Sequence, residues 1–174
     1  MRKKRYFRIF VPVLFLLFVL LFTAGCGKTQ EESRYHIAYL NKDKTGIVEV
    51  PYEMKATTTE TMIEEFFAAL CAEPDDVDYR KPIPSDVEIT KYSLDGALLT
   101  IYFDADYLNM NEVEEVLCRA AIVRTLTQIT GVDCVSFYVD ETPLTDAEGR
   151  LVGTMYGESF VENPGEQINS IQNT

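Results

Sequence analysis

One stretch of the sequence, residues 111–139, constrains the fold more than any other. Asn111 is a suitable N-cap for a helix, and Glu114 lies three residues later, as a capping box requires. Gly131 stands where a left-handed residue would end this helix, and residues 132–139 have the β-branched and aromatic composition of a buried strand. The helical spacing is that of an amphipathic helix with a broad apolar face, formed by Val113, Val116, Leu117, Ala120 and Val123 and widened by Ile122, Leu126 and Ile129. A helix this apolar needs a sheet to cover, so the rest of the chain must supply one.

Two β-hairpins are predicted before this stretch. Residues 35–50 form two strand patterns around a turn-rich centre, and Pro51 is expected to end the second strand. Residues 87–103 form a second pair, which turns at Asp95-Gly96, the strongest hairpin signal in the chain.

A second helix is predicted between the hairpins, over residues 57–72. Thr57 is the expected N-cap with Glu60 as its capping-box partner, and Pro74 stops the helix. The order hairpin, helix, hairpin, helix, strand predicts an α+β fold, in which the two helices pack on one face of a small mixed or antiparallel sheet.

The first 25 residues have the features of a bacterial lipoprotein signal peptide. Residues 1–8 are basic, and residues 9–22 form an apolar run of 14 residues, which is shorter than a bilayer-spanning helix. Small residues followed by Cys26 resemble a lipobox, although Thr23 occupies the position that is usually leucine. The resemblance implies that Cys26 is lipidated and that residues 26–34 form a tether. An uncleaved membrane anchor is the alternative, and both place the domain on the extracytoplasmic face of the cell membrane.

The charge of the chain argues against a nucleic-acid partner. The sequence has 28 acidic and 16 basic residues, a formal net charge of −12. Five of the basic residues precede Cys26 and no acidic residue does, so the part after the signal peptide carries about −17. Phosphate binding needs basic patches, which this composition does not supply.

Three further cysteines, Cys71, Cys118 and Cys134, fall among apolar residues of the expected helices and strands. An odd number cannot all pair, and their spacing matches no zinc site. We therefore expect buried free thiols, with a Cys71–Cys118 bridge between the two helices as the alternative.

No motif in the sequence predicts catalysis, a metal or a cofactor. The only histidine, His36, lies in a strand pattern, and the sequence contains neither a G-x-S-x-G motif nor a glycine-rich phosphate loop. The acidic loop at residues 73–78 lacks the glycine and closing glutamate of an EF-hand. Asp104, Asp106 and Asn109 are spaced too weakly to predict a cation site, so we expect a protein that is not an enzyme and binds no cofactor.

Six segments together carry a resemblance to a known family: residues 37–50, 57–72, 83–87, 94–103, 120–128 and 131–135. The most specific features are Ile83-Pro84, Asp95-Gly96 and the run Thr125-Leu126-Thr127-Gln128 before Gly131-Val132. These segments resemble the GerMN domain of sporulation and spore-germination proteins, over residues 35–144.

This resemblance implies a function without catalysis. Members of the family are commonly lipoproteins or membrane-anchored proteins, which agrees with Cys26, and they have no known catalytic residues to transfer. The fold of the family resembles the ring-building modules of the sporulation channel, which implies self-association or docking to envelope proteins. We therefore expect a lipid-anchored scaffold in an envelope assembly linked to sporulation or germination. A lipoprotein that binds a small ligand or a cell-wall fragment is the alternative.

Thr125, Thr127 and Gln128 lie near the end of the long helix. Threonine hydroxyls there can bond to carbonyls one turn earlier, which would give these residues a structural role, and contact with a partner is the alternative. The C-terminal extension, residues 145–174, is expected to wrap the domain and then to fray, or alternatively to bind a partner as a strand. Its expected anchors are Leu151, Met155, Tyr156 and Phe160.

Overall fold

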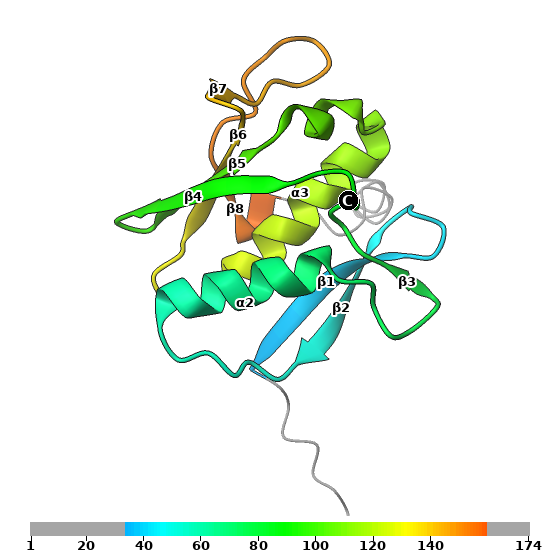
Figure 1. The fold of residues 1–174 in the computed structure, drawn as a ribbon, viewed down its shortest axis with the longest axis vertical. Helices are drawn as coiled ribbons and strands as arrows, with labels where there is room; N and C mark the ends of the chain where they lie inside the picture. The colour runs from blue at the N-terminus through cyan, green and yellow to red at the C-terminus, as the bar shows by residue number, and fades with distance from the viewer. Residues whose placement is uncertain (1–33, 160–174) are drawn as a thin grey trace, which may run out of the picture. The chain divides into compact units, whose positions relative to one another are not determined.

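Two α-helices and two β-sheets form residues 34–159, the part of the 174-residue chain that the computed structural model describes (Figure 1). The predictions for the signal peptide, for Cys26, for most of the tether and for Phe160 and the residues after it lie outside these described residues. Within residues 34–159, neither helix combines the length and the apolar character that crossing a bilayer requires.

The first sheet has the strand order β2-β1-β3 and is antiparallel throughout. Its strands are β1 (Tyr35–Asn41), β2 (Ile47–Tyr52) and the two-residue β3 (Tyr79–Arg80). The hairpin predicted at residues 35–50 is confirmed, but β2 continues through Pro51, where we expected it to end. Pro51 is tolerated because it pairs with His36, whose backbone groups point away from β2, so no bond between the strands is lost.

The second sheet is mixed and has the order β4-β5-β6-β7, with β8 also paired to β6. Its strands are β4 (Ile89–Asp95), β5 (Leu98–Phe103), β6 (Cys134–Val139), β7 (Thr142–Pro143) and β8 (Met155–Tyr156). The β4–β5 hairpin is confirmed, and Gly96 has a φ of +59° at the first of its two turn positions, as a type II′ turn requires. The strands β5 and β6 are parallel and are connected through the long helix.

The two helices are α2 (Thr59–Cys71) and α3 (Glu112–Leu126). The capping box of α2 is formed by Thr58 and Thr61, so the prediction of Thr57 and Glu60 was wrong by one position. Asn111 caps α3 as expected, because its side chain accepts a hydrogen bond from the Glu114 N–H. The helix α3 ends at Leu126, earlier than predicted, and the left-handed Gly131 (φ +96°) closes the turn that follows it.

The α+β class with two helices is confirmed, but the strands divide into two sheets where we expected one. In Figure 1, α3 lies between these sheets, and it contacts β1 and β2 of the first and β8 of the second. From Cys118 to Val123 every residue of α3 is buried, because this part of the helix lies between the two sheets. The first turns of α3 are different: Val113 and Val116, predicted as core, are 61% and 40% exposed.

A polar network that the sequence analysis did not predict joins α3 to the segment before it. Arg119 is only 7% exposed, and its guanidinium donates two hydrogen bonds to the Glu115 carboxylate, at 2.6 and 2.8 Å. The Tyr107 hydroxyl, in the short 3₁₀ helix η1 (Ala105–Asn109), donates to the same carboxylate at 2.9 Å. Burial raises the pKa of Tyr107 well above its usual value, so the hydroxyl keeps its proton and remains a donor.

Hydrogen bonds of Glu65 connect α2 to the end of β2 and to the segment that follows it. Its carboxylate accepts hydrogen bonds from the Tyr52 hydroxyl at 2.9 Å and from the N–H groups of Lys55 and Ala56 at 3.0 and 2.8 Å. The pKa of Tyr52 is raised to about 12, mainly by burial and to a smaller extent by the hydrogen bond to Glu65.

Several expectations for the cysteines and the C-terminal extension are corrected. Cys71, Cys118 and Cys134 are free thiols, but only Cys118 is buried. Met155 packs against the core as part of β8, whereas Leu151 and Tyr156 are 69% and 49% exposed and do not anchor the extension. Strand pairing of β8 with β6, together with the packing of Met155 and Val152 against the core, holds this segment on the domain.

Candidate functional site

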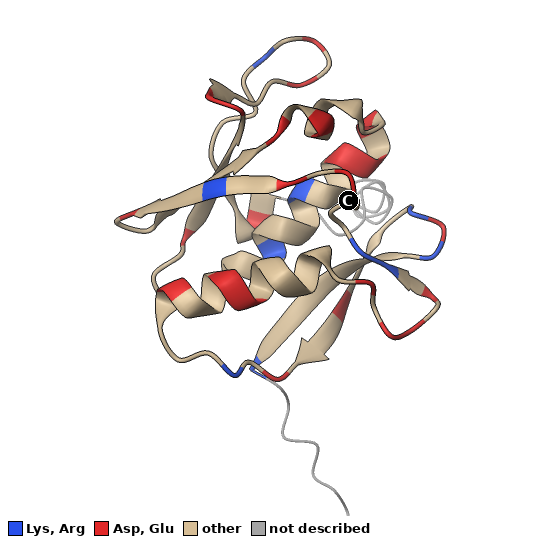
Figure 2. Ribbon diagram, in the orientation of Figure 1, with Lys and Arg blue, Asp and Glu red and all other residues tan. Residues whose placement is uncertain are grey.

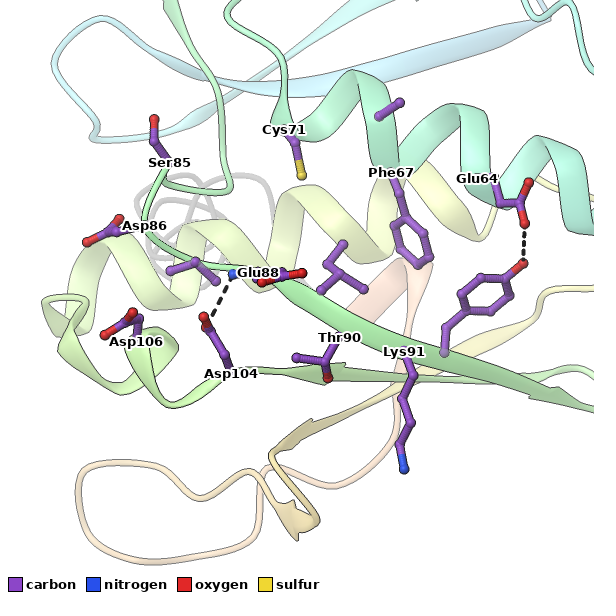
Figure 3. Close-up of a pocket in the computed structure, with 14 residues that line it drawn as sticks. Glu64, Phe67, Cys71, Ser85, Asp86, Glu88, Thr90, Lys91, Asp104 and Asp106 are labelled. Carbon is purple, nitrogen blue, oxygen red and sulfur yellow. Dashed lines mark hydrogen bonds between the residues drawn. The ribbon is translucent and has the colours of Figure 1, made fainter.

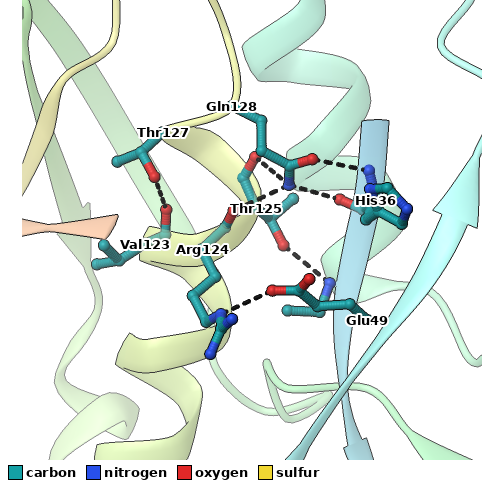
Figure 4. A network of polar contacts seen from close by, with 8 residues as sticks. His36, Glu49, Val123, Arg124, Thr125, Thr127 and Gln128 are labelled. Atoms are coloured by element: carbon teal, nitrogen blue, oxygen red, sulfur yellow. Dashed lines mark hydrogen bonds and ion pairs between the residues drawn. The ribbon is translucent and has the colours of Figure 1, made fainter. Parts of the chain in front are cut away.

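Three residues of the Thr-Leu-Thr-Gln run make hydrogen bonds to backbone groups inside the domain (Figure 4). The Gln128 side chain accepts a hydrogen bond from the His36 N–H and donates one to the His36 C=O, both at 2.8 Å. Thr125, fully buried, accepts from the Ala38 N–H at 3.0 Å. These are the backbone groups that β1 would offer to a neighbouring strand.

Gln128 and Thr125 therefore replace a missing strand. The strand β3 pairs with β1 only at Leu40 and Asn41, which leaves the edge of β1 before them without a strand. Thr125 and Gln128 are three residues apart across the end of α3, which corresponds to about 4.5 Å at the rise of a helix, while two strand residues span about 6.7 Å. The long glutamine side chain makes up this difference, which explains a threonine and a glutamine at this spacing.

Thr127 and Arg124 complete the network. The Thr127 hydroxyl donates to the Val123 C=O at 2.8 Å, one turn earlier in α3. The Arg124 guanidinium donates to Glu49 of β2 at 2.7 Å and so connects α3 to the hairpin. Thr125, Thr127 and Gln128 thus all make hydrogen bonds to backbone groups within the domain.

A second feature, which the sequence analysis did not identify, is an open groove of about 870 Å³ between α2 and β4. Figure 3 shows Glu64, Phe67 and Cys71 on the α2 side of this groove. Tyr92 of β4 meets α2 through its ring, which packs edge-on against Phe67 at 5.4 Å, and through its hydroxyl, which donates to Glu64 at 3.2 Å. Below, we call this feature the α2–β4 groove.

The α2–β4 groove lies beside the edge of β4 rather than over one of its faces. Its lining includes six consecutive residues, 87–92. Successive side chains of a strand point to opposite faces, so a cavity over one face would be lined by every second residue. Of these six, residues 89–92 belong to β4, and contact with all four consecutive strand residues indicates that the groove follows the border of the sheet.

The groove is acidic. Its lining contains five carboxylates and one cationic side chain. The carboxylates are Glu64, Asp86, Glu88, Asp104 and Asp106. The cation, Lys91, points away from α2, toward Glu141 at 2.7 Å and the Tyr102 ring at 4.3 Å (Figure 3). Figure 2 shows the acidic positions along α2 and at the start of β4.

Two features of the described side chains bear on their reactivity. Burial raises the pKa of Cys71, Cys118 and Cys134, which disfavours the reactive thiolate form. Within residues 34–159, no three His, Cys, Asp or Glu side chains are grouped as a metal site would require. The Asp104 side chain accepts a hydrogen bond from the Glu88 N–H at 3.2 Å.

Comparison with known proteins places the fold in a family. The model of the Germane family, described as sporulation and spore germination, matches residues 36–145. No curated protein matches the chain.

Three solved structures share the fold. The first GerMN domain of the sporulation protein GerM from Bacillus subtilis has a TM-score of 0.57 at 13% identity, covering 72% of this chain and 98% of that one. The tandem GerMN domains of the same protein give 0.51 at 14% identity, with coverages of 75% and 51%. A proposed lipoprotein from Clostridium perfringens gives 0.50 at 17% identity, with coverages of 74% and 95%.

Proposed function

This chain belongs to the Germane family of sporulation and spore germination, and from that premise we propose that it is a lipid-anchored protein-interaction domain without catalytic activity. It would act on the extracytoplasmic face of the cell membrane, as a scaffold in an envelope assembly. The observation that carries the proposal is the seven-residue strand β4, which lies at the border of its sheet beside the open α2–β4 groove. Sheet borders with unpaired backbone groups are surfaces to which other chains add.

Support for the anchor comes from the sequence and from one structural relative. Cys26 follows a basic segment, an apolar run and small residues, which is the order found in lipoprotein precursors. One structure with the same fold is that of a proposed lipoprotein. Two acyl chains would hold the domain stably at the membrane, where a single chain would not.

Support for a role without catalysis comes from the side chains in the described part of the chain. His36, the only histidine of the sequence, lies on β1, where its backbone pairs with Gln128. The thiol pKa values are raised, so the cysteines are poor nucleophiles at neutral pH. The polar residues that resemble the family most closely serve to close the edge of β1.

Crosslinking of the full chain in intact cells of its own host tests this function. We expect membrane-bound protein with a lipid-modified residue 26 by mass spectrometry, crosslinked to a second envelope protein or to another copy. The Cys26→Ala variant should lose the membrane fraction and the crosslink together. An unmodified thiol at residue 26 on protein recovered from the cytosol would overturn the proposal, as would the absence of any crosslinked partner.

The α2–β4 groove also favours a second candidate function, a lipoprotein that binds a small ligand or a cell-wall fragment. A volume of about 870 Å³ is within the range of ligand sites, and the groove combines apolar and polar side chains. A thermal-shift experiment with soluble wall fragments distinguishes the two functions, because a ligand at 100 times its Kd adds about 2.7 kcal/mol of stability. A melting temperature that does not move would exclude this alternative for the fragments tested.

A further inference from the structure

The border of β4 differs from the other strand borders in residues 34–159. The edge of β1 is closed by Thr125 and Gln128. The strand β2 carries Pro51, which lacks an N–H on its outer side, and β3, β7 and β8 are two residues long. By contrast, β4 has seven residues and no proline, and no backbone hydrogen bond joins residues 90–94 to any described segment except β5.

The register of the hairpin shows which groups of β4 are free. Asp95 and Leu98 close a two-residue turn, and in such a hairpin the closing pair exchanges hydrogen bonds. Because bonded and non-bonded pairs alternate along an antiparallel ladder, the N–H and C=O groups of Tyr92 and Leu94 point away from β5. An added strand would find its donors and acceptors there, at Tyr92, which lines the groove, and at Leu94, two residues beyond it.

The charge of the groove selects the kind of strand. Five carboxylates line it, and they come from α2, from the segment that leads into β4 and from the segment after β5. The lysine on β4 is held on the far side by Glu141, so it does not offset them. A second copy of this chain would bring the same carboxylates to the same border, and their repulsion disfavours self-pairing there.

We propose that the β4 border and the α2–β4 groove bind an extended, basic segment of a partner protein, which adds to the second sheet as a further strand. This inference rests on the proposed interaction function and names the partner chemistry. Main-chain hydrogen bonds to Tyr92 and Leu94 supply affinity. Lysine or arginine at every second position of the segment faces the carboxylates, and such complementarity supplies specificity and a fast association rate.

A pair of synthetic peptides tests both parts of the proposal on the full chain in a non-ionic detergent. The first is a fluorescent ten-residue peptide of alternating lysine and threonine. The second has the same sequence and charge but is N-methylated at alternate residues, so that one edge cannot donate hydrogen bonds. We expect the first peptide to bind in fluorescence anisotropy at about 50 mM salt, and the second to bind at least about tenfold more weakly.

Matched charge variants locate the site. Asp86 and Glu88 are exposed and their carboxylates make no hydrogen bond within the described residues, so the double variant D86K/E88K should fold normally. It should weaken peptide binding by roughly tenfold or more, because four units of charge change beside the peptide. The control D43K/E53K makes the same change in net charge at exposed positions outside the groove and should change binding by less than about twofold.

Hydrogen exchange supplies a readout at single residues. The amides of Tyr92 and Leu94 should exchange roughly tenfold more slowly when the unmethylated peptide is bound, while those of β2 stay unchanged. Equal binding of the two peptides, equal weakening by both double variants, or protection away from β4 would each overturn the inference. In-cell crosslinks that survive in D86K/E88K would leave the proposed function standing while this inference fails.

Discussion

The replacement of a strand by Thr125 and Gln128 makes a quantitative prediction about stability. The Gln128→Ala variant leaves the N–H and the C=O of His36 without partners in a half-buried position. An unsatisfied buried group costs about 1–3 kcal/mol. Each of the two groups should cost an amount near the lower end of that range, because water reaches part of the site. We therefore expect the free energy of unfolding to fall by roughly 2–3 kcal/mol in total. That loss is a large share of the 5–15 kcal/mol by which domains of this kind are typically stable.

The Thr125→Val variant isolates a single hydrogen bond at nearly constant volume. Valine places a methyl group where the hydroxyl stood, and the N–H of Ala38, which is 1% exposed, then has no acceptor. Because the site is fully buried, we expect a loss of about 2–3 kcal/mol, in the upper part of the range for an unsatisfied group. The matched control, Thr125→Ser, keeps the acceptor and loses only a methyl group, which costs about 1 kcal/mol.

The free energy of unfolding in urea, measured on the fragment that begins at Lys28, checks these values. A second control is Gln128→Glu, which keeps an acceptor for the His36 N–H but turns a carboxylate toward the carbonyls of His36, Arg124 and Thr125. We expect it to be no more stable than Gln128→Ala. A loss below about 0.5 kcal/mol in Gln128→Ala, or equal losses in Thr125→Val and Thr125→Ser, would refute the reasoning.

Three further predictions concern other parts of the domain. Burial alone would raise the pKa of Glu65, but the hydrogen bonds it accepts lower it, so its contribution is present above pH 4.5 and is lost as pH falls through the folded-state pKa. Urea titrations from pH 3 to 7 should therefore show that the free energy of unfolding falls less on acidification in Glu65→Gln than in the parent. Arg119→Ala leaves Glu115 half-buried without its cation, and thermal unfolding should report a loss of about 3 kcal/mol. Gly96→Ala forces a side chain into a positive φ, and its unfolding free energy should fall by about 1 kcal/mol.

The parts of the fold that local chemistry determines were predictable from the sequence. Asp95-Gly96 marks a hairpin because glycine alone adopts the required φ easily, and Asn111 caps α3 because its side chain reaches an N–H three residues on. The ends of α2 and α3 were less predictable. Thr57 and Glu60 match the usual capping-box sequence, whereas the box that forms, Thr58 with Thr61, has a threonine where the rule expects Glu or Gln.

The division into two sheets was not predictable, because it depends on side chains that pair with a backbone. Gln128 takes the place of a strand next to β1, and no periodicity in the sequence indicates that a glutamine 92 residues away will do so. The spacing of Val113 and Val116 also predicts a core stripe, but both side chains are exposed in the first turns of α3. The α2–β4 groove escaped prediction because its lining comes from three separate segments, between residues 64 and 106.

The contrast between two strand borders connects the fold to the proposed function. At β1 an open border is closed by two side chains, Thr125 of α3 and Gln128 of the turn that follows it. The border of β4, which is as long, has no such closure within residues 34–159, and open borders are a liability for aggregation. The carboxylates around it limit that liability, because they repel other copies of an acidic chain and leave the border accessible to a basic one. For the proposed interaction function, a border that repels other copies of this chain and attracts a basic segment would favour binding to a partner over pairing with itself at β4.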